Sequence, residues 1–169
     1  MRKGHINNRQ KRQSAGGGIM TWGMVMPNGL LAVKILEGKQ NSASYIQLFK
    51  DFVVPLMNIN YEAGYSVVHD NSPIHASRAF KDYASTQTFQ VREWPARSPD
   101  LNIMENVWKM LSDIVYSAEQ PHNKRQLLEK IHEAVLEINQ TKREVTRGLY
   151  AHFRRRLTAL LICKGNNVK

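Results

Sequence analysis

The chain has 169 residues, a formal net charge of +10 and a single cysteine. This length fits one domain with a sizeable core. Because Cys163 stands alone, an intrachain disulfide framework and a multi-cysteine zinc site are excluded, and a reducing compartment is favoured. No apolar run approaches the length of a membrane span, and the N-terminus is polar and basic. We therefore expect a soluble intracellular protein with no membrane partner.

The positive charge is concentrated at the two ends of the chain. Residues 1–12 hold five basic residues, and the residues from 142 onward hold eight basic residues against Glu144 alone. Such ends favour a polyanionic partner, most commonly nucleic acid. Solvated tails that only aid solubility explain the charge equally well. The residues predicted to bind DNA are Arg2, Lys3, Arg9, Lys11, Arg12, Arg154, Arg155 and Arg156.

The chain opens with a basic arm, predicted over residues 1–15, and then a hairpin. Two apolar runs within residues 16–38 flank the turn sequence Pro27-Asn28-Gly29, which predicts two antiparallel strands. The residues that follow, 41–57, carry apolar side chains at helical spacing. We expect Ser42 or Ser44 to cap this helix.

Pro55 is expected to bend or shorten the end of that helix. Short β-branched or aromatic runs then alternate with amphipathic segments, which indicates an α/β architecture built in layers. The predicted elements are a buried strand over residues 65–70, a helix over 75–84, a strand over 89–94 and a helix over 101–116.

Two more helices are predicted near the C-terminus. The first follows Pro121 and the second covers about residues 143–162. In each, apolar residues recur every three or four positions and so mark an inward face. These residues are Leu128, Ile131, Val135 and Ile138 in the first helix, and Val145, Leu149, Phe153 and Leu160 in the second.

Asp70 ends the predicted strand over 65–70, and ligands tend to bind at strand ends in α/β sheets. Its polar neighbours His69, Asn71 and His75 make this short loop a candidate site. An alternative is structural, because Asp-Asn-Ser-Pro is also good turn chemistry and Asn71 could simply cap the turn.

Glu105 is a second candidate, because it borders the apolar face of the predicted helix over 101–116. That face is formed by Leu101, Met104, Trp108, Leu111 and Val115. A first-turn glutamate that is stabilised by the helix dipole is the structural alternative. If Asp70 and Glu105 converge, however, two carboxylates can hold Mg²⁺ together with phosphate oxygens and water. Two ions held in this way can support phosphodiester chemistry.

Two segments carry a resemblance to a known family. VVHDNSPIHASR and WPARSPDLNIMENVW, with 34 residues between Asp70 and Glu105, resemble the DDE transposases of the mariner superfamily, and GGGIMTWGMVMPNG resembles the strand pair ahead of their second acid. The resemblance covers about residues 12–118. It implies an RNase H-like mixed sheet flanked by helices, Mg²⁺ or Mn²⁺ as cofactor, and cut-and-paste transposition of DNA.

The resemblance assigns Asp70 as the second metal-binding catalytic acid and Glu105 as the third. The residues that it places beside the site are His69, Asn71, His75, Asn102 and Asn106. The family's first catalytic Asp should end an upstream strand, yet this chain has no Asp or Glu before Glu37. We therefore expect a partial catalytic domain over 16–118 that lacks its first, central strand, followed by C-terminal helices with a basic tail over 119–169.

Three hypotheses follow from these observations. The first is a fragment of a DDE transposase that is inactive as given, with DNA as partner and the nucleus as location. The second is a non-catalytic DNA-binding remnant or a domesticated transposase-derived protein. The third is an RNase H-fold nuclease unrelated to transposition, which would leave the SPDLN-x-x-EN context unexplained. Whether the chain forms a homodimer is open in all three.

Overall fold

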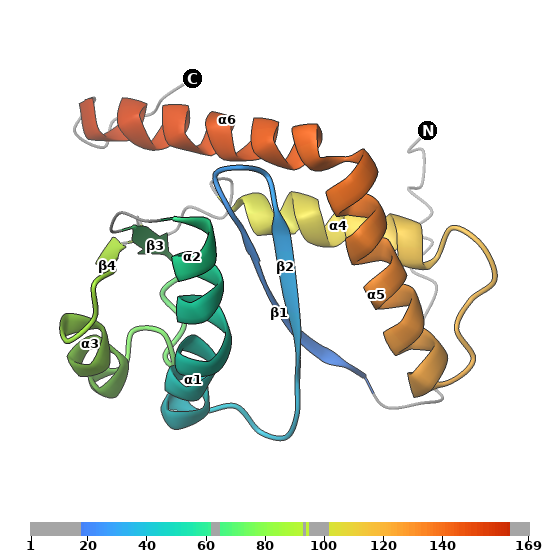
Figure 1. Cartoon of the computed structure of the whole chain (residues 1–169), viewed down its shortest axis with the longest axis horizontal. Helices are drawn as coiled ribbons and strands as arrows, with labels where there is room; N and C mark the ends of the chain where they lie inside the picture. Colours follow the sequence, from blue (N-terminus) through green and yellow to red (C-terminus); the bar gives the residue numbers. More distant parts are fainter. Residues whose placement is uncertain (1–17, 62–64, 93, 95–101, 163–169) are drawn as a thin grey trace, which may run out of the picture.

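The computed structural model describes residues 18–61, 65–92, 94 and 102–162 (Figure 1). Helices flank a central β-hairpin on two sides, and the last helix runs across the end of the hairpin. The elements are β1 (Met20–Val25), β2 (Leu31–Leu36), α1 (Ser42–Leu48), the π-helical turn η1 (Phe49–Val53), α2 (Val54–Asn60), β3 (Ser66–Val68), α3 (Arg78–Ser85), β4 (Gln90–Arg92), α4 (Ile103–Val115), α5 (Lys124–Thr141) and α6 (Arg143–Ile162). None of the helices in the described ranges is long and apolar enough to cross a membrane.

The predicted hairpin is confirmed, with β1 and β2 antiparallel in a register that pairs Val25 with Leu31. Successive side chains of a strand point to opposite sides, so the hairpin has two faces, and each packs against a different hydrophobic cluster. Trp22 and Met24 pack into the cluster that contains α1 and α2, whereas Val33 and Ile35 pack into the cluster that contains α4 and α5. The hairpin is therefore the middle of three layers.

The helix predicted over residues 41–57 exists, but its cap and its end differ from expectation. Asn41 is the N-cap, and its side chain accepts a hydrogen bond from the backbone N–H of Ser44 while Ser44 Oγ accepts one from the N–H of Asn41. Ser42 is already helical. Pro55 does not end the helix: it lies in the first turn of α2, where a missing N–H is tolerated, and the wider turn η1 precedes it.

Strands β3 and β4 are parallel, with Val67 opposite Val91. The prediction of a buried strand at this point was wrong, since Ser66 is exposed and Val67 and Val68 are half-buried. In the part of the chain that the structure describes, the four strands form two separate pairs, β1 with β2 and β3 with β4. The predicted mixed α/β fold is confirmed.

Helices α4 and α5 cover one face of the hairpin. Their buried residues are Val107, Leu111 and Val115 in α4 and Ile131, Ala134 and Ile138 in α5. In α4 the apolar face is centred on Val107, which is fully buried, so Met104 and Trp108 flank it rather than form its middle. Trp108 nevertheless lies directly over β1, because a Cβ added to Gly23 would come within 2.7 Å of its ring.

Helix α6 packs across the hairpin turn through polar contacts. Thr146 is fully buried and its hydroxyl donates to the carbonyl oxygen of Gly29, while Arg143 Nε donates to the carbonyl oxygen of Asn28 at 3.1 Å. The predicted inward position of Val145 was wrong, since its side chain is 54% exposed and Thr146 takes the inward place. Phe153 is buried as predicted, and the side chain of Leu160 lies outside the described residues.

Candidate functional site

Asp70 lies two residues beyond β3 and its carboxylate organises the following turn. Its Oδ1 accepts a hydrogen bond from the backbone N–H of Ser72 at 3.1 Å and pairs with His75 Nδ1 at 2.7 Å. Partial burial by itself would raise the pKa of Asp70, but these two partners outweigh it and hold the pKa below its ordinary value. The carboxylate is therefore ionised at neutral pH. No described residue donates a hydrogen bond to Oδ2.

The two histidines beside Asp70 have different surroundings. The ring of His75 stacks on buried Tyr45 with 4.3 Å between centroids, which fixes the nitrogen that pairs with Asp70. His69 packs edge-on against Phe80 at 5.5 Å, and its buried Nε2 has no hydrogen-bond partner among the described residues. Burial lowers the pKa of His69, so its ring is neutral at physiological pH. His75 positions the carboxylate of Asp70, and His69 packs against Phe80 in the core next to the turn.

Asn71 connects the Asp70 turn to the segment after β4. Its side-chain amide donates to the carbonyl oxygen of Trp94 at 3.1 Å. The Trp94 ring in turn stacks on Phe153 of α6, with 6.1 Å between centroids and 10° between planes. The turn that carries the candidate carboxylate is thus joined to α6 by two successive contacts.

Glu105 is exposed in the first turn of α4. Asn102 caps this helix by accepting a hydrogen bond from the backbone N–H of Met104 at 3.1 Å, and its carbonyl oxygen accepts one from the N–H of Glu105. Met104 packs against β1, one residue before Glu105, because its methyl group is 3.0 Å from a Cβ added to Gly23. Asn102 therefore has a clear structural role, whereas Asn106 is exposed.

Four of the predicted site residues come together around one turn: His69, Asp70, Asn71 and His75. The convergence of Asp70 with Glu105 stays a prediction, and Leu101, predicted on the apolar face of the same helix, lies outside the described residues. Among those that are described, no three His, Cys, Asp or Glu side chains form a ready metal-binding cluster. Two carboxylates are nevertheless the hard oxygen donors that Mg²⁺ and Mn²⁺ accept, and Oδ2 of Asp70 fits this role.

The predicted DNA-binding residues are only partly placed. Arg154, Arg155 and Arg156 are exposed on α6, whereas the N-terminal set Arg2, Lys3, Arg9, Lys11 and Arg12 lies outside the described residues. Arg147 and Tyr150 were not among the predicted residues, and they border a depression together with Arg154. Their spacing of three, four and seven residues on one helix was the signal that could have found them.

Comparison with known proteins decides the family. A family model described as "DDE superfamily endonuclease" matches residues 1–128, three quarters of the chain. The chain belongs to this family. Among curated relatives of this DDE endonuclease chain, the Tc3 transposase of Caenorhabditis elegans is 30% identical over 112 residues, which is 66% of this chain and 34% of that protein. The Tc1 transposase of the same organism is 26% identical over 96 residues, 57% of this chain and 35% of that protein.

The chain thus spans about a third of the length of these curated relatives. Solved structures agree on the fold of this DDE endonuclease chain. The catalytic domain of Mos1 mariner transposase has a TM-score of 0.66 at 17% identity, covering 91% of this chain and 83% of that one. The Mos1 mariner paired end complex with Mn has a TM-score of 0.69, also at 17% identity, covering 99% and 52%. The fold is therefore that of a mariner-like, RNase H-like catalytic domain.

Proposed function

We propose that this chain is part of the catalytic domain of a cut-and-paste DNA transposase, whose activity is metal-dependent DNA cleavage and strand transfer. One structural observation supports this most: the strand-end carboxylate of Asp70, ionised and fixed by His75 and Ser72, stands in the HDN context of a DDE endonuclease. The Tc3 and Tc1 relatives are transposases, and the Mos1 complex contains Mn.

In this proposal Asp70 and Glu105 are two acidic ligands of a Mg²⁺ or Mn²⁺ site. Such ions, when bound, activate an attacking oxygen and stabilise the departing one in phosphodiester chemistry. The chain's own contribution is orientation. His75, stacked on Tyr45, pairs with Oδ1 of Asp70, and Asn102 caps the first turn of α4, which carries Glu105.

We also propose that the 169 residues alone do not cleave DNA. The sequence has no acid before Glu37; Glu37 follows β2, and Asp51 lies in η1, where its carboxylate accepts hydrogen bonds from Gln47. Mg²⁺ dehydrates reluctantly, so a site short of one carboxylate binds it weakly, and in-line displacement tolerates little error in position. β1 and β3 each pair with one described strand only, so an added strand that ends in Asp could join the two sheets and supply the ligand.

Nicking of supercoiled plasmid in Mg²⁺ tests the proposal. The chain should show no nicking, whereas a version extended before residue 12 by a strand ending in Asp should nick. The matched control extension ends in Asn, and Asp70→Asn in the active version should abolish nicking again.

Nicking by the unextended chain that is lost in Asp70→Asn would overturn the proposed inactivity. A folded, Asp-extended chain that binds DNA and does not nick would favour the second candidate, a non-catalytic DNA-binding protein. That candidate is supported by the basic face of α6, which is independent of any metal ligand.

A further inference from the structure

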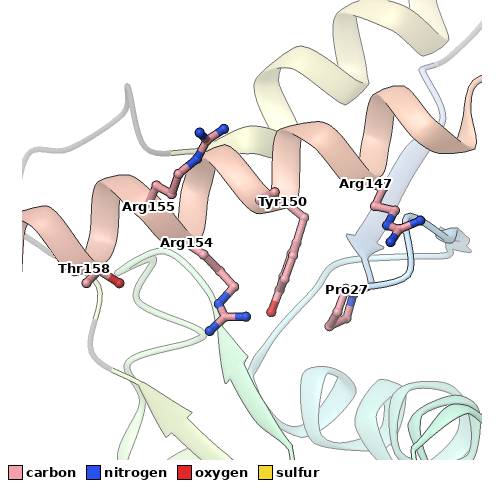
Figure 2. Close-up of a pocket in the computed structure, with 7 residues that line it drawn as sticks. Pro27, Arg147, Tyr150, Arg154, Arg155 and Thr158 are labelled. Atoms are coloured by element: carbon pink, nitrogen blue, oxygen red, sulfur yellow. The ribbon is translucent and has the colours of Figure 1, made fainter.

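Helix α6 carries a basic groove along the side that faces the hairpin turn. Two adjacent depressions, of about 580 and about 600 Å³, share Pro27 and Arg147 and together extend from Arg143 to Thr158. Figure 2 shows Arg147, Tyr150 and Arg154 on the side of α6 toward Pro27, with Thr158 further along the helix. Arg155 also lines the groove, although its guanidinium turns toward the opposite side of the helix in this view.

The groove residues recur at the period of one helix face. Arg147, Tyr150 and Arg154 are separated by three and four positions, so their side chains line up along α6. Seven residues of helix span about 10.5 Å, the axial rise of about three phosphates on one strand of DNA. Arg147 and Arg154 are both exposed, and the one acid among the residues that line the two depressions is Glu144, which pairs with Arg147 at 3.4 Å.

These features fit a nucleic-acid strand better than a small anion. Arginine presents a planar fork that matches phosphate oxygens, and two such forks a few phosphates apart select a repeating backbone. Tyr150 lies between them, half-buried, and offers an aromatic surface for a base or sugar. The groove is also joined to the Asp70 turn, because Phe153, next to Arg154, stacks on Trp94 and Trp94 accepts the Asn71 hydrogen bond.

We propose that the face formed by Arg147, Tyr150 and Arg154 binds the phosphate backbone of a DNA strand and holds it beside the Asp70 turn. This inference rests on the proposed function and deepens it, because it assigns DNA binding to one defined face of α6 and not to the overall positive charge of the chain. The inference also distinguishes the three consecutive arginines 154–156. Consecutive helical residues point about 100° apart, so only Arg154 shares the face of Arg147.

Fluorescence anisotropy of the full chain with a labelled DNA duplex, measured over a series of salt concentrations, tests this. In Arg147→Gln/Arg154→Gln the slope of log affinity against log salt should become less steep by about 1.8, since each lost phosphate contact removes about 0.9. The matched control is Lys39→Gln/Lys124→Gln, which loses the same charge at exposed positions outside the groove. Its slope should stay at the wild-type value. Circular dichroism melting should show that both variants are folded.

Three results would overturn the proposal: equal slope changes in the two double variants, no DNA binding by the wild-type chain at low salt, or displacement of DNA by polyglutamate as readily as by unlabelled DNA. Mn²⁺ binding, measured without DNA, separates this proposal from the proposed function. The groove variant should bind Mn²⁺ like the wild type, so a negative result for the groove would not count against the proposed metal site. An Mn²⁺ affinity that Asp70→Asn leaves unchanged, in a chain whose groove behaves as expected, overturns the metal site alone.

Discussion

At the scale of single residues, the two histidines next to Asp70 in the structure, His69 and His75, have different surroundings. His75 pairs with Asp70 and is half-buried, whereas His69 points its Nε2 into the interior, where no described residue meets it. The HDN motif identified the acid, and the turn sequence after it explains the Ser72 contact. The stacking of His75 on Tyr45 could not be predicted, because Tyr45 belongs to a helix far away in the sequence.

The half-buried ring of His69, whose Nε2 is fully buried, should make stability depend on pH. Burial lowers its pKa in the folded state below the ordinary value of 6.5, so the unfolded chain binds this proton more readily. The stability that comes from neutral His69 is present above that ordinary value and is lost as the pH falls through the lowered folded pKa. Between about pH 7.5 and about pH 5, His69→Phe should therefore lose less Tm than the wild type.

Thermal melts at several pH values check this, with exposed His132→Phe on α5 as the control. That control should lose Tm with falling pH as the wild type does. An unchanged pH dependence in His69→Phe would show that His69 is not the buried group responsible.

At the scale of elements, the close contact between the hairpin turn and α6 decides how the C-terminal helix sits. Gly29 has φ of 81°, and a Cβ on it would lie 2.4 Å from the carbonyl oxygen of Arg143. Asn139 of α5 makes a similar contact with β2: its side chain accepts from the N–H of Leu31 at 2.8 Å and donates to the Leu31 carbonyl at 2.9 Å. Both contacts tie the hairpin to helices more than one hundred residues later.

Gly29→Ala should destabilise the fold more than Gly38→Ala. Gly38 also has positive φ, 64°, but a Cβ there would meet nothing within 4 Å. Each substitution carries the strain of positive φ, on the order of 1 kcal/mol, and Gly29→Ala adds the clash with α6, for a total of about 2–3 kcal/mol. Urea unfolding of the two variants measures the difference. Equal losses in both would mean that α6 does not rest on the turn.

Hydrophobic periodicity predicted most elements well, including both strands of the hairpin and the bounds of α6, because each pattern is local to its element. Periodicity failed where a contact with a distant part of the chain decides which residue is buried or how a helix continues. Nothing in the sequence around Pro55 marks the π-helical turn before it. Buried Thr146 bonds to the carbonyl oxygen of Gly29, more than one hundred residues earlier in the chain. Val145 looked like the inward residue on apolarity alone, yet it is exposed.

At the scale of the whole molecule, three layers bring the Asp70 turn, α4 and α6 into one fold, although these parts are dispersed along the sequence (Figure 1). Motif spacing predicted the pair Asp70 and Glu105, and the family match supports the context of both. Charge predicted a basic C-terminal helix without showing which of its arginines share a face. We propose above all that one divalent ion is held by both Asp70 and Glu105.

Titration of the full chain with Mn²⁺, followed by electron paramagnetic resonance, tests that claim most directly. Asp70→Asn and Glu105→Gln should each weaken binding about tenfold or more, as loss of a metal ligand does. The control Asp113→Asn, on α4 and paired with Lys109 at 2.6 Å, should bind like the wild type. The double variant Asp70→Asn/Glu105→Gln should bind little more weakly than either single variant, because the two residues share one ion. Wild-type binding in Glu105→Gln, or independent and additive losses, would contradict the claim.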